Sequence, residues 1–246
     1  MTRGMSSENE SLRSGPAEDW DLWPDGERSP AMNMAVDEAL LCSTAERGRP
    51  LVRFYGWDRM AVSIGYLQDY DAAPEGYAVV RRPTGGGVVY HDHDFTYTVI
   101  IPKTHWLAEA KPVASYGYVN RAVAEGLRLG LSSEAQLSAA SIGEHVDRRS
   151  MVCFENPTRY DIMLGGDKVA GSAQRRRPEG ILHQGSIHFG GDLPLGRDEL
   201  ADAVAAGFQK ALAIRFVPFR PVPALLAAAD ELSRKRYATA AWNRKR

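Results

Sequence analysis

Short runs of β-branched and aromatic residues, interrupted by Gly, Pro and Asp, recur along most of the chain. Such runs are typical of β-strands, because branched and aromatic side chains pack well on a pleated surface. The first two runs, 51–57 and 60–66, are separated by only two residues, and we expect them to form a strand pair. Further strands are predicted over 77–83, 86–92, 95–102, 159–164, 168–173 and 181–189.

Other stretches have the three- and four-residue spacing of apolar positions that indicates a helix. Ser29 suits an N-cap and Pro30 the first helical position, so the first helix is expected to start there. Strands and helices fall in blocks instead of alternating, which indicates an α+β fold with a mostly antiparallel or mixed sheet. Helices are predicted over 31–46, 116–131, 197–214 and 223–242.

The composition narrows the class of protein. The chain has 246 residues, 44% hydrophobic and 25% charged, with a net charge of -1, so we expect no nucleic-acid partner. No apolar run approaches the about 18 residues of a membrane span, and two cysteines make no disulfide framework. We expect a cytoplasmic protein without membrane contact. Residues 1–16 are polar and are predicted to be a disordered tail before a single domain over 17–246.

The stretch "RRPTGGGVVYHD", Arg81 to Asp92, has two arginines followed by three glycines. Glycines let backbone N–H groups approach a ligand closely, and arginines can bind a phosphate or carboxylate with two hydrogen bonds. The lysine of a Walker motif is missing, so this is not a P-loop. A glycine-rich turn between strands with solvated arginines remains an equal alternative. The following "HDHD", from His91, is predicted to be a polar turn or substrate-binding loop, more readily than a metal site.

The two cysteines differ in context. Cys153 is followed by "ENP", which favours a loop, so its thiol is the more available one. Lys168 follows fifteen positions later, and an ammonium close to a thiol favours the thiolate. Packing of Cys153 in the interior remains the alternative, because separation along the chain does not fix distance. Cys42 lies in a helix beside two leucines and is predicted to be buried in the core.

Two further features are open to more than one interpretation. His183 lies in a strand-like run, "LHQGSI", where a histidine is more often structural than catalytic. The run Arg175 to Arg177 either docks an acidic partner domain or is a solvated loop.

Several motifs in a fixed order resemble one superfamily. "RRPTGGGVVYHD", "YDIMLGGDKVAGSAQ" and "GILHQGSI", with "RSPAMNMAVDEALL", "LVRFYGWDRMAVSIGYLQ" and "KRYATAAWN", are similar to the biotin/lipoate protein ligase superfamily, in its lipoate ligase and octanoyltransferase branch. The resemblance covers nearly the whole chain from Trp20 and implies one α+β domain whose central sheet surrounds an acyl-binding tunnel. It implies Cys153 as the acyl-carrying nucleophile and Lys168 at the reacting carbonyl. The substrate-binding residues that it implies are Arg81, Arg82, Gly85, Gly86, Gly87, Tyr90, His91, Gly171, Ser172, Ala173, His183 and Gly185.

The stretch around Cys153 looks like the cysteine-dependent octanoyltransferases common in Gram-positive bacteria. The resemblance then implies octanoyl transfer from acyl carrier protein, without metal or cofactor, to a lysine of a lipoyl domain. Acceptors of that kind are the glycine cleavage H protein and dehydrogenase E2 subunits. The alternatives are a lipoate ligase that uses ATP and Mg, or an amidotransferase that moves octanoyl between lipoyl proteins. A binding protein without activity is disfavoured, because it has no use for a nucleophile.

Overall fold

The computed structural model describes residues 17–140, 146–147 and 149–245, so the expected tail over 1–16 lies outside the described residues. Its main element is an eight-stranded mixed sheet, in agreement with the predicted α+β class. Strands β11, β1 and β2 run parallel to one another, and the remaining neighbours are antiparallel. In spatial order the strands are β11 (Ile214–Pro218), β1 (Glu18–Arg28), β2 (Leu51–Trp57), β6 (Phe95–Pro102), β10 (Gly180–Ile187), β9 (Asp167–Arg177), β8 (Ile162–Leu164) and β7 (Gln136–Leu137).

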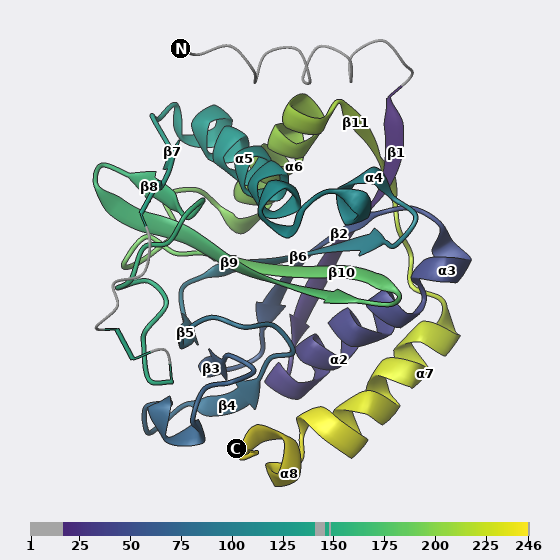
Figure 1. Ribbon diagram of the computed structural model, residues 1–246, viewed down its shortest axis with the longest axis vertical. Coiled ribbons are helices and arrows are strands. Elements are labelled where there is room, and N and C mark those ends of the chain that lie inside the picture. The colour runs from purple at the N-terminus through teal and green to yellow at the C-terminus, as the bar shows by residue number, and fades with distance from the viewer. Residues whose placement is uncertain (1–16, 141–145, 148, 246) are drawn as a thin grey trace.

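Helices cover both faces of this sheet (Figure 1). On one face lie α5 (Pro112–Leu131) and α6 (Arg197–Leu212), over side chains such as Val99 of β6. On the other face lie α2 (Pro30–Cys42) and α7 (Pro223–Leu232), over the next residue, Ile100. The alternation follows from the two-residue period of a strand. Shorter helical pieces are α3 (Thr44–Arg47), η1 (Tyr70–Ala72), α4 (Trp106–Glu109), the π-helical turn η2 (Ser233–Tyr237) and α8 (Ala240–Asn243).

A second, three-stranded sheet has the order β4 (Ala78–Arg81), β3 (Ala61–Ile64) and β5 (Val89–His91). The expected pairing of runs 51–57 and 60–66 is therefore wrong. Both runs form strands, but β2 belongs to the large sheet and β3 to the small one. The two intervening residues are exposed and form a bend between the sheets instead of a hairpin turn. None of the helices in the described ranges is both long and apolar enough to cross a membrane.

Several elements differ from the prediction: the strands β1, β7 and β11 were not predicted, and the last predicted helix is interrupted. β1 is absent from the predicted strands, because its sequence is rich in Asp, Glu and Pro. The strand nevertheless lies between two neighbours, and its buried Asp25 is paired with Arg53 at 2.9 Å. The single helix predicted over 223–242 is interrupted by η2, whose wider turn precedes the short α8.

Helices α5 and α6 touch through two glycines. A Cβ built on Gly207 would overlap the backbone of Gly126 and Ala122, and one on Gly126 would lie 2.6 Å from the Cα of Val204. The close approach therefore depends on the missing side chains.

Replacing Gly207 by Ala should lower the free energy of unfolding by about 2 kcal/mol. Overpacking typically costs 1–3 kcal/mol, and overlap with backbone atoms belongs at the upper end of that range. The gain in helix propensity is about 1 kcal/mol, which leaves the net loss. Urea denaturation followed by circular dichroism measures the effect. Gly191→Ala is the control, because a Cβ there has no atom within 4 Å. Equal stability of the two variants would contradict this account of the helix contact.

Candidate active site

Cys153 lies in the long segment between β7 and β8, and backbone hydrogen bonds hold it against the glycine-rich loop. Its N–H donates to the Val88 carbonyl at 2.9 Å, and the Val88 N–H donates to the Met151 carbonyl at 2.9 Å. Gly87 allows this approach, because a Cβ there would lie 2.5 Å from the Met151 oxygen and 2.9 Å from the Cys153 nitrogen. The two motifs that the sequence singled out thus form one structural unit.

Lys168 reaches Cys153 from β9. Its Nζ lies 3.5 Å from the Cys153 Sγ and donates to the Cys153 carbonyl at 2.7 Å. Gly171 makes room for the lysine, since a Cβ there would lie 2.8 Å from the Lys168 Cε. An ammonium in this position stabilises a thiolate. The structure therefore brings together the two residues expected to be catalytic.

Asp161, which sequence reasoning missed, completes the arrangement. Its Oδ2 lies 2.7 Å from the Lys168 Nζ, and both side chains are almost fully buried. The same oxygen accepts hydrogen bonds from the Thr158 N–H at 2.7 Å and hydroxyl at 3.0 Å. The carboxylate is thus fixed in place and determines where the ammonium points. A single acid next to the apolar strand "IML" was the sequence signal for such a role.

Arg82 is buried beneath the glycine-rich loop. Its guanidinium donates to the carbonyls of Gly85, Gly87 and Ser63, at 2.7, 2.7 and 2.8 Å. Burial lowers the pKa of Arg82 to about 10, an effect that the nearby Cys153 opposes by favouring the charged form. The alternative of a solvated arginine is therefore wrong for this side chain, whose donors bond backbone carbonyls, while its role in substrate binding stays a prediction. It shapes the loop and adds positive charge beside Cys153.

Arg81 points away from Cys153. It is fully buried and donates to the carbonyls of Gly65, Gln68 and Asn243, at 3.0, 2.5 and 2.8 Å. Its role is to join the loop after β3 to the C-terminal segment. It does not line the cavity beside Cys153.

A narrow cavity of about 40 Å³ opens beside Cys153. Its apolar wall is made by Met34, Tyr55, Trp57 and Val89. The cavity thus combines a nucleophile with apolar side chains, as an acyl-binding site requires. Seven of the residues that the motifs singled out as substrate-binding line it: Arg82, Gly86, His91, Gly171, Ser172, Ala173 and Gly185.

His91 lines the cavity and is held on three sides. Its ring stacks on Trp57 with centroids 3.8 Å apart, and its two nitrogens lie 2.8 Å from the Asp94 Oδ2 and 2.8 Å from the Ser63 Oγ. Burial would raise the pKa of Asp94, but His91 and hydrogen bonds from Ser186 and Thr96 hold it below its ordinary value. Within the described ranges, no three His, Cys, Asp or Glu side chains form a group suited to a metal.

The remaining residues implied by the resemblance do not line the cavity. The Tyr90 ring packs edge-on against Tyr77, and Gly85 has open space around it. His183 lies on the other face of the sheet, between Tyr97 and Tyr116. Within the described part of the chain neither of its ring nitrogens has a hydrogen-bond partner, and burial lowers the pKa of His183 to about 3.

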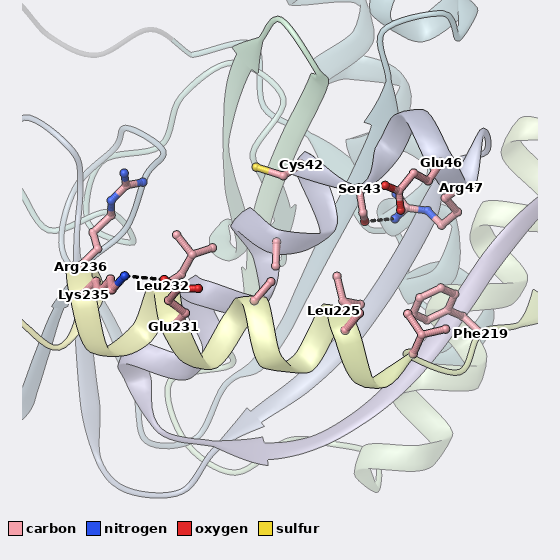
Figure 2. Close-up of a pocket in the computed structure, with 14 residues that line it drawn as sticks. Cys42, Ser43, Glu46, Arg47, Phe219, Leu225, Glu231, Leu232, Lys235 and Arg236 are labelled. Atoms are coloured by element: carbon pink, nitrogen blue, oxygen red, sulfur yellow. Dashed lines mark hydrogen bonds and ion pairs between the residues drawn. The ribbon is translucent and has the colours of Figure 1, made fainter.

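Cys42 is not a core residue, contrary to the prediction. It is the last residue of α2, and its side chain is exposed in a groove of about 810 Å³ between α2 and α7 (Figure 2). The prediction from the helix pattern failed because Cys42 lies in the last turn of α2, where the buried part of the helix ends. Partial burial, together with the carboxylates of Glu38 and Glu179, raises the pKa of the Cys42 thiol. This groove is larger than the cavity beside Cys153, and Lys235, which lines it, is paired with Glu231.

Cys153 should react with iodoacetamide at pH 7 at least about tenfold faster than Cys42, although Cys42 is more exposed. The reason is that alkylation requires the thiolate, which Lys168 stabilises at Cys153 and which the raised pKa disfavours at Cys42. Peptide mapping of a time course gives both rates in one molecule. Lys168→Met should slow the alkylation of Cys153 and leave the alkylation rate of Cys42 unchanged. Faster reaction at Cys42 in the wild type would disprove the assignment.

His183 should make the protein less stable as the pH falls from 7 to 5. In that range the unfolded chain binds a proton at His183, with an ordinary pKa of 6.5, whereas the folded protein does not. The folded state thus loses about 1.4 kcal/mol per pH unit below 6.5, or about 2 kcal/mol by pH 5. Urea denaturation of the wild type and His183→Phe at both pH values measures this. The same pH dependence in both proteins would show that His183 is not the cause.

The chain is similar to known proteins over most of its length. Residues 29–216 match the lipoyl protein ligase A/B catalytic domain. The octanoyltransferase LipM of Halalkalibacterium halodurans is 33% identical, over 92% of this chain and 99% of its own. That of Brevibacillus brevis is 35% identical, over 89% and 96%. A solved lipoate-protein ligase A bound with ATP shares the fold, with a TM-score of 0.76, 24% identity and coverage of 92% and 98%. The chain therefore belongs to the lipoyl protein ligase A/B catalytic domain family.

Proposed function

We propose that this protein moves an octanoyl group from a carrier thioester to a lysine of a lipoyl domain, by way of a thioester on Cys153. The observation that carries the proposal is the Lys168 ammonium, 3.5 Å from the Cys153 thiol at an apolar cavity. Octanoyl transfer is supported by relatives named octanoyltransferase, which match about nine-tenths of the chain. We propose octanoyl-acyl carrier protein as donor, and the glycine cleavage H protein or dehydrogenase E2 subunits as acceptors.

The reaction has two acyl transfers. The Cys153 thiolate attacks the thioester carbonyl, a new C–S bond forms, and the carrier thiol leaves with a proton. The neutral amine of the acceptor lysine then attacks the Cys153 thioester, an amide forms, and the cysteine sulfur leaves as the thiolate. The nitrogen loses one proton to solvent in this step, which balances the proton that the carrier thiol takes up from solvent in the first. Lys168 stabilises the thiolate in both steps and donates a hydrogen bond to the oxyanion that forms in each. Asp161 holds the ammonium in position between these events.

The proposed reaction needs no ATP or metal. A thioester is already activated, and its conversion to an amide is downhill. A ligase that starts from the free acid must instead form an acyl-adenylate, and Cys153 would then have no part in catalysis. The related ligase bound with ATP shows that this fold accommodates that chemistry, so the test must include it.

The octanoyl chain would lie along the apolar wall made by Met34, Tyr55 and Trp57. Burial of seven methylene or methyl groups contributes about 5 kcal/mol, at roughly 0.8 kcal/mol each. The cavity is only about 40 Å³, so side chains of its wall must move as the octanoyl chain enters. Met34 is suited to this, because its unbranched side chain adapts to irregular spaces.

Intact-protein mass spectrometry tests the proposal directly. Incubation with octanoyl-acyl carrier protein, without ATP, should add one octanoyl group, ~126 Da, to the wild type. The adduct should disappear on treatment with hydroxylamine, which cleaves a thioester. Cys153→Ala should show no adduct, and Cys42→Ala is the matched control that should still be acylated.

Two outcomes would change the conclusion. An adduct that forms only from an octanoylated lipoyl protein would show that the donor is that protein and not acyl carrier protein. The protein would then be an amidotransferase. Transfer that requires ATP and free octanoate, and that survives in Cys153→Ala, would make the protein a ligase.

A further inference from the structure

Four cations gather at the rim of the loops that hold Cys153: Arg149, Arg175, Arg244 and Lys245. We call this set the basic rim. Lys245 Nζ lies 3.5 Å from the ring centroids of both Tyr66 and Trp242, and Arg175 Cζ lies 4.3 Å from that of Tyr66. Stacking on aromatic rings holds these charges in place without neutralising them.

The run Arg175 to Arg177 contributes only one residue to the basic rim. Arg176 donates to the carbonyls of Ala108 and Ala110, at 2.7 and 2.8 Å, on the face covered by α5. Arg177 lies 3.7 Å from the Glu179 carboxylate. Only Arg175, which donates to the Pro83 carbonyl at 2.8 Å, lies beside the glycine-rich loop. Successive residues of β9 point to opposite faces, so the run cannot act as one docking surface.

The basic rim lacks carboxylate partners. Among the residues that the structure describes, none of its four cations has a carboxylate oxygen within 4.0 Å. Three acids lie nearby: Asp69 and Asp71 line the adjacent groove, and the Asp147 carboxylate accepts a hydrogen bond from the Arg149 N–H at 3.0 Å. The buried Arg81 attracts Asp69, so three acids stand against the four cations of the rim and Arg81. The local charge is therefore positive, although the whole chain carries -1.

A groove of about 630 Å³ runs beside these charges. It is lined by Tyr70, Arg149, Ser150, Arg244 and Lys245, together with Asp69, Asp71 and Ala72. Its wall continues directly into the segment that carries Cys153.

Backbone contacts tie this groove to the catalytic loop. The Asp69 N–H donates to the Arg149 carbonyl at 3.2 Å, and the Gln68 side chain donates to the Met151 carbonyl at 3.0 Å. Between these contacts and the glycine-rich loop, Leu67 projects into solvent with 81% of its surface exposed. An exposed leucine beside unpaired cations is typical of a protein contact.

We propose that the basic rim docks the acyl donor, an acidic carrier protein, and that the adjacent groove receives its phosphopantetheine arm. The inference rests on the proposed function and adds a surface to it. The arm carries a phosphodiester, which arginine and lysine bind well. The acceptor instead presents an amine that is cationic before it reacts, and Arg149, Arg244 and Lys245 would repel it. The charge of the groove therefore matches the donor and not the acceptor.

Reversing exposed charges on the basic rim tests the proposal. In Arg149→Glu/Arg244→Glu, and separately in Lys245→Glu, kcat/KM for acylation by octanoyl-acyl carrier protein should fall by about 10- to 100-fold. The loss should lie in KM, and it should shrink as ionic strength rises. Acylation by octanoyl-N-acetylcysteamine, a neutral thioester without a carrier protein or phosphate, should stay within about twofold of wild type. Lys103→Glu, an exposed cation at the end of β6, is the matched control.

Each other result has a definite meaning. Equal rates with the carrier protein in wild type and rim variants would overturn the docking surface and leave the proposed function intact. A similar loss of kcat/KM in Lys103→Glu would show that the effect comes from the net charge of the protein. That result would also overturn the docking surface. Slower transfer from the preformed acyl-enzyme to a lipoyl domain, with normal acylation, would assign the surface to the acceptor. If the wild type accepts an acyl group from neither thioester, the proposed function fails, and the docking surface with it.

Discussion

The candidate site depends on two hydrogen bonds that join Val88 to the segment from Met151 to Cys153. They place the cysteine of one loop against the glycine-rich loop of another, about 65 residues earlier in the chain. Gly87 permits the contact, and Arg82 stabilises it from below by binding the carbonyls of the same loop. Without this pairing, Lys168 on β9 would have no thiol to face. The candidate nucleophile is thus positioned by backbone hydrogen bonds, and the Lys168 side chain extends to it from β9.

A buried polar network fixes the opposite wall of the cavity. Asp37 on α2 accepts hydrogen bonds from Arg53, Thr98 and Gln184, each at 2.7 Å. Gln184 in turn lines the cavity and accepts a hydrogen bond from Thr84, just before the glycines. Buried ion pairs contribute little net stability, but removing one partner is costly because the other charge is left uncompensated. The network therefore sets the register of α2 on the sheet and, through Gln184, the shape of the site.

The two arginines of the motif have structural contacts that the motif did not predict. Arg81 joins the loop after β3 to the C-terminal segment through the carbonyls of Gly65 and Asn243. Arg82 holds the glycine-rich loop through the Gly87 carbonyl and bonds the Ser63 carbonyl of β3. Cations without a carboxylate partner among the described residues lie elsewhere, at Arg149, Arg244 and Lys245, none of which belongs to a recognisable motif. The arginines of the motif thus serve the structure, and the proposed docking surface is built from other cations.

The sequence by itself determined the class of fold and most of the strands and helices, because periodicity is a property of neighbouring residues. It also singled out Cys153 and Lys168 as a candidate pair, and the structure brings the two side chains together. It did not reveal β1, whose buried Asp21 and Asp25 are paired with arginines from other parts of the fold, or the exposure of Cys42, which depends on where α2 ends. It also could not separate His91, which lines the cavity, from His183, which faces α5 across the sheet. Only the tertiary structure decided which side chains meet. The reason is that packing fixes which neighbour each face of a strand contacts and which distant loops approach each other.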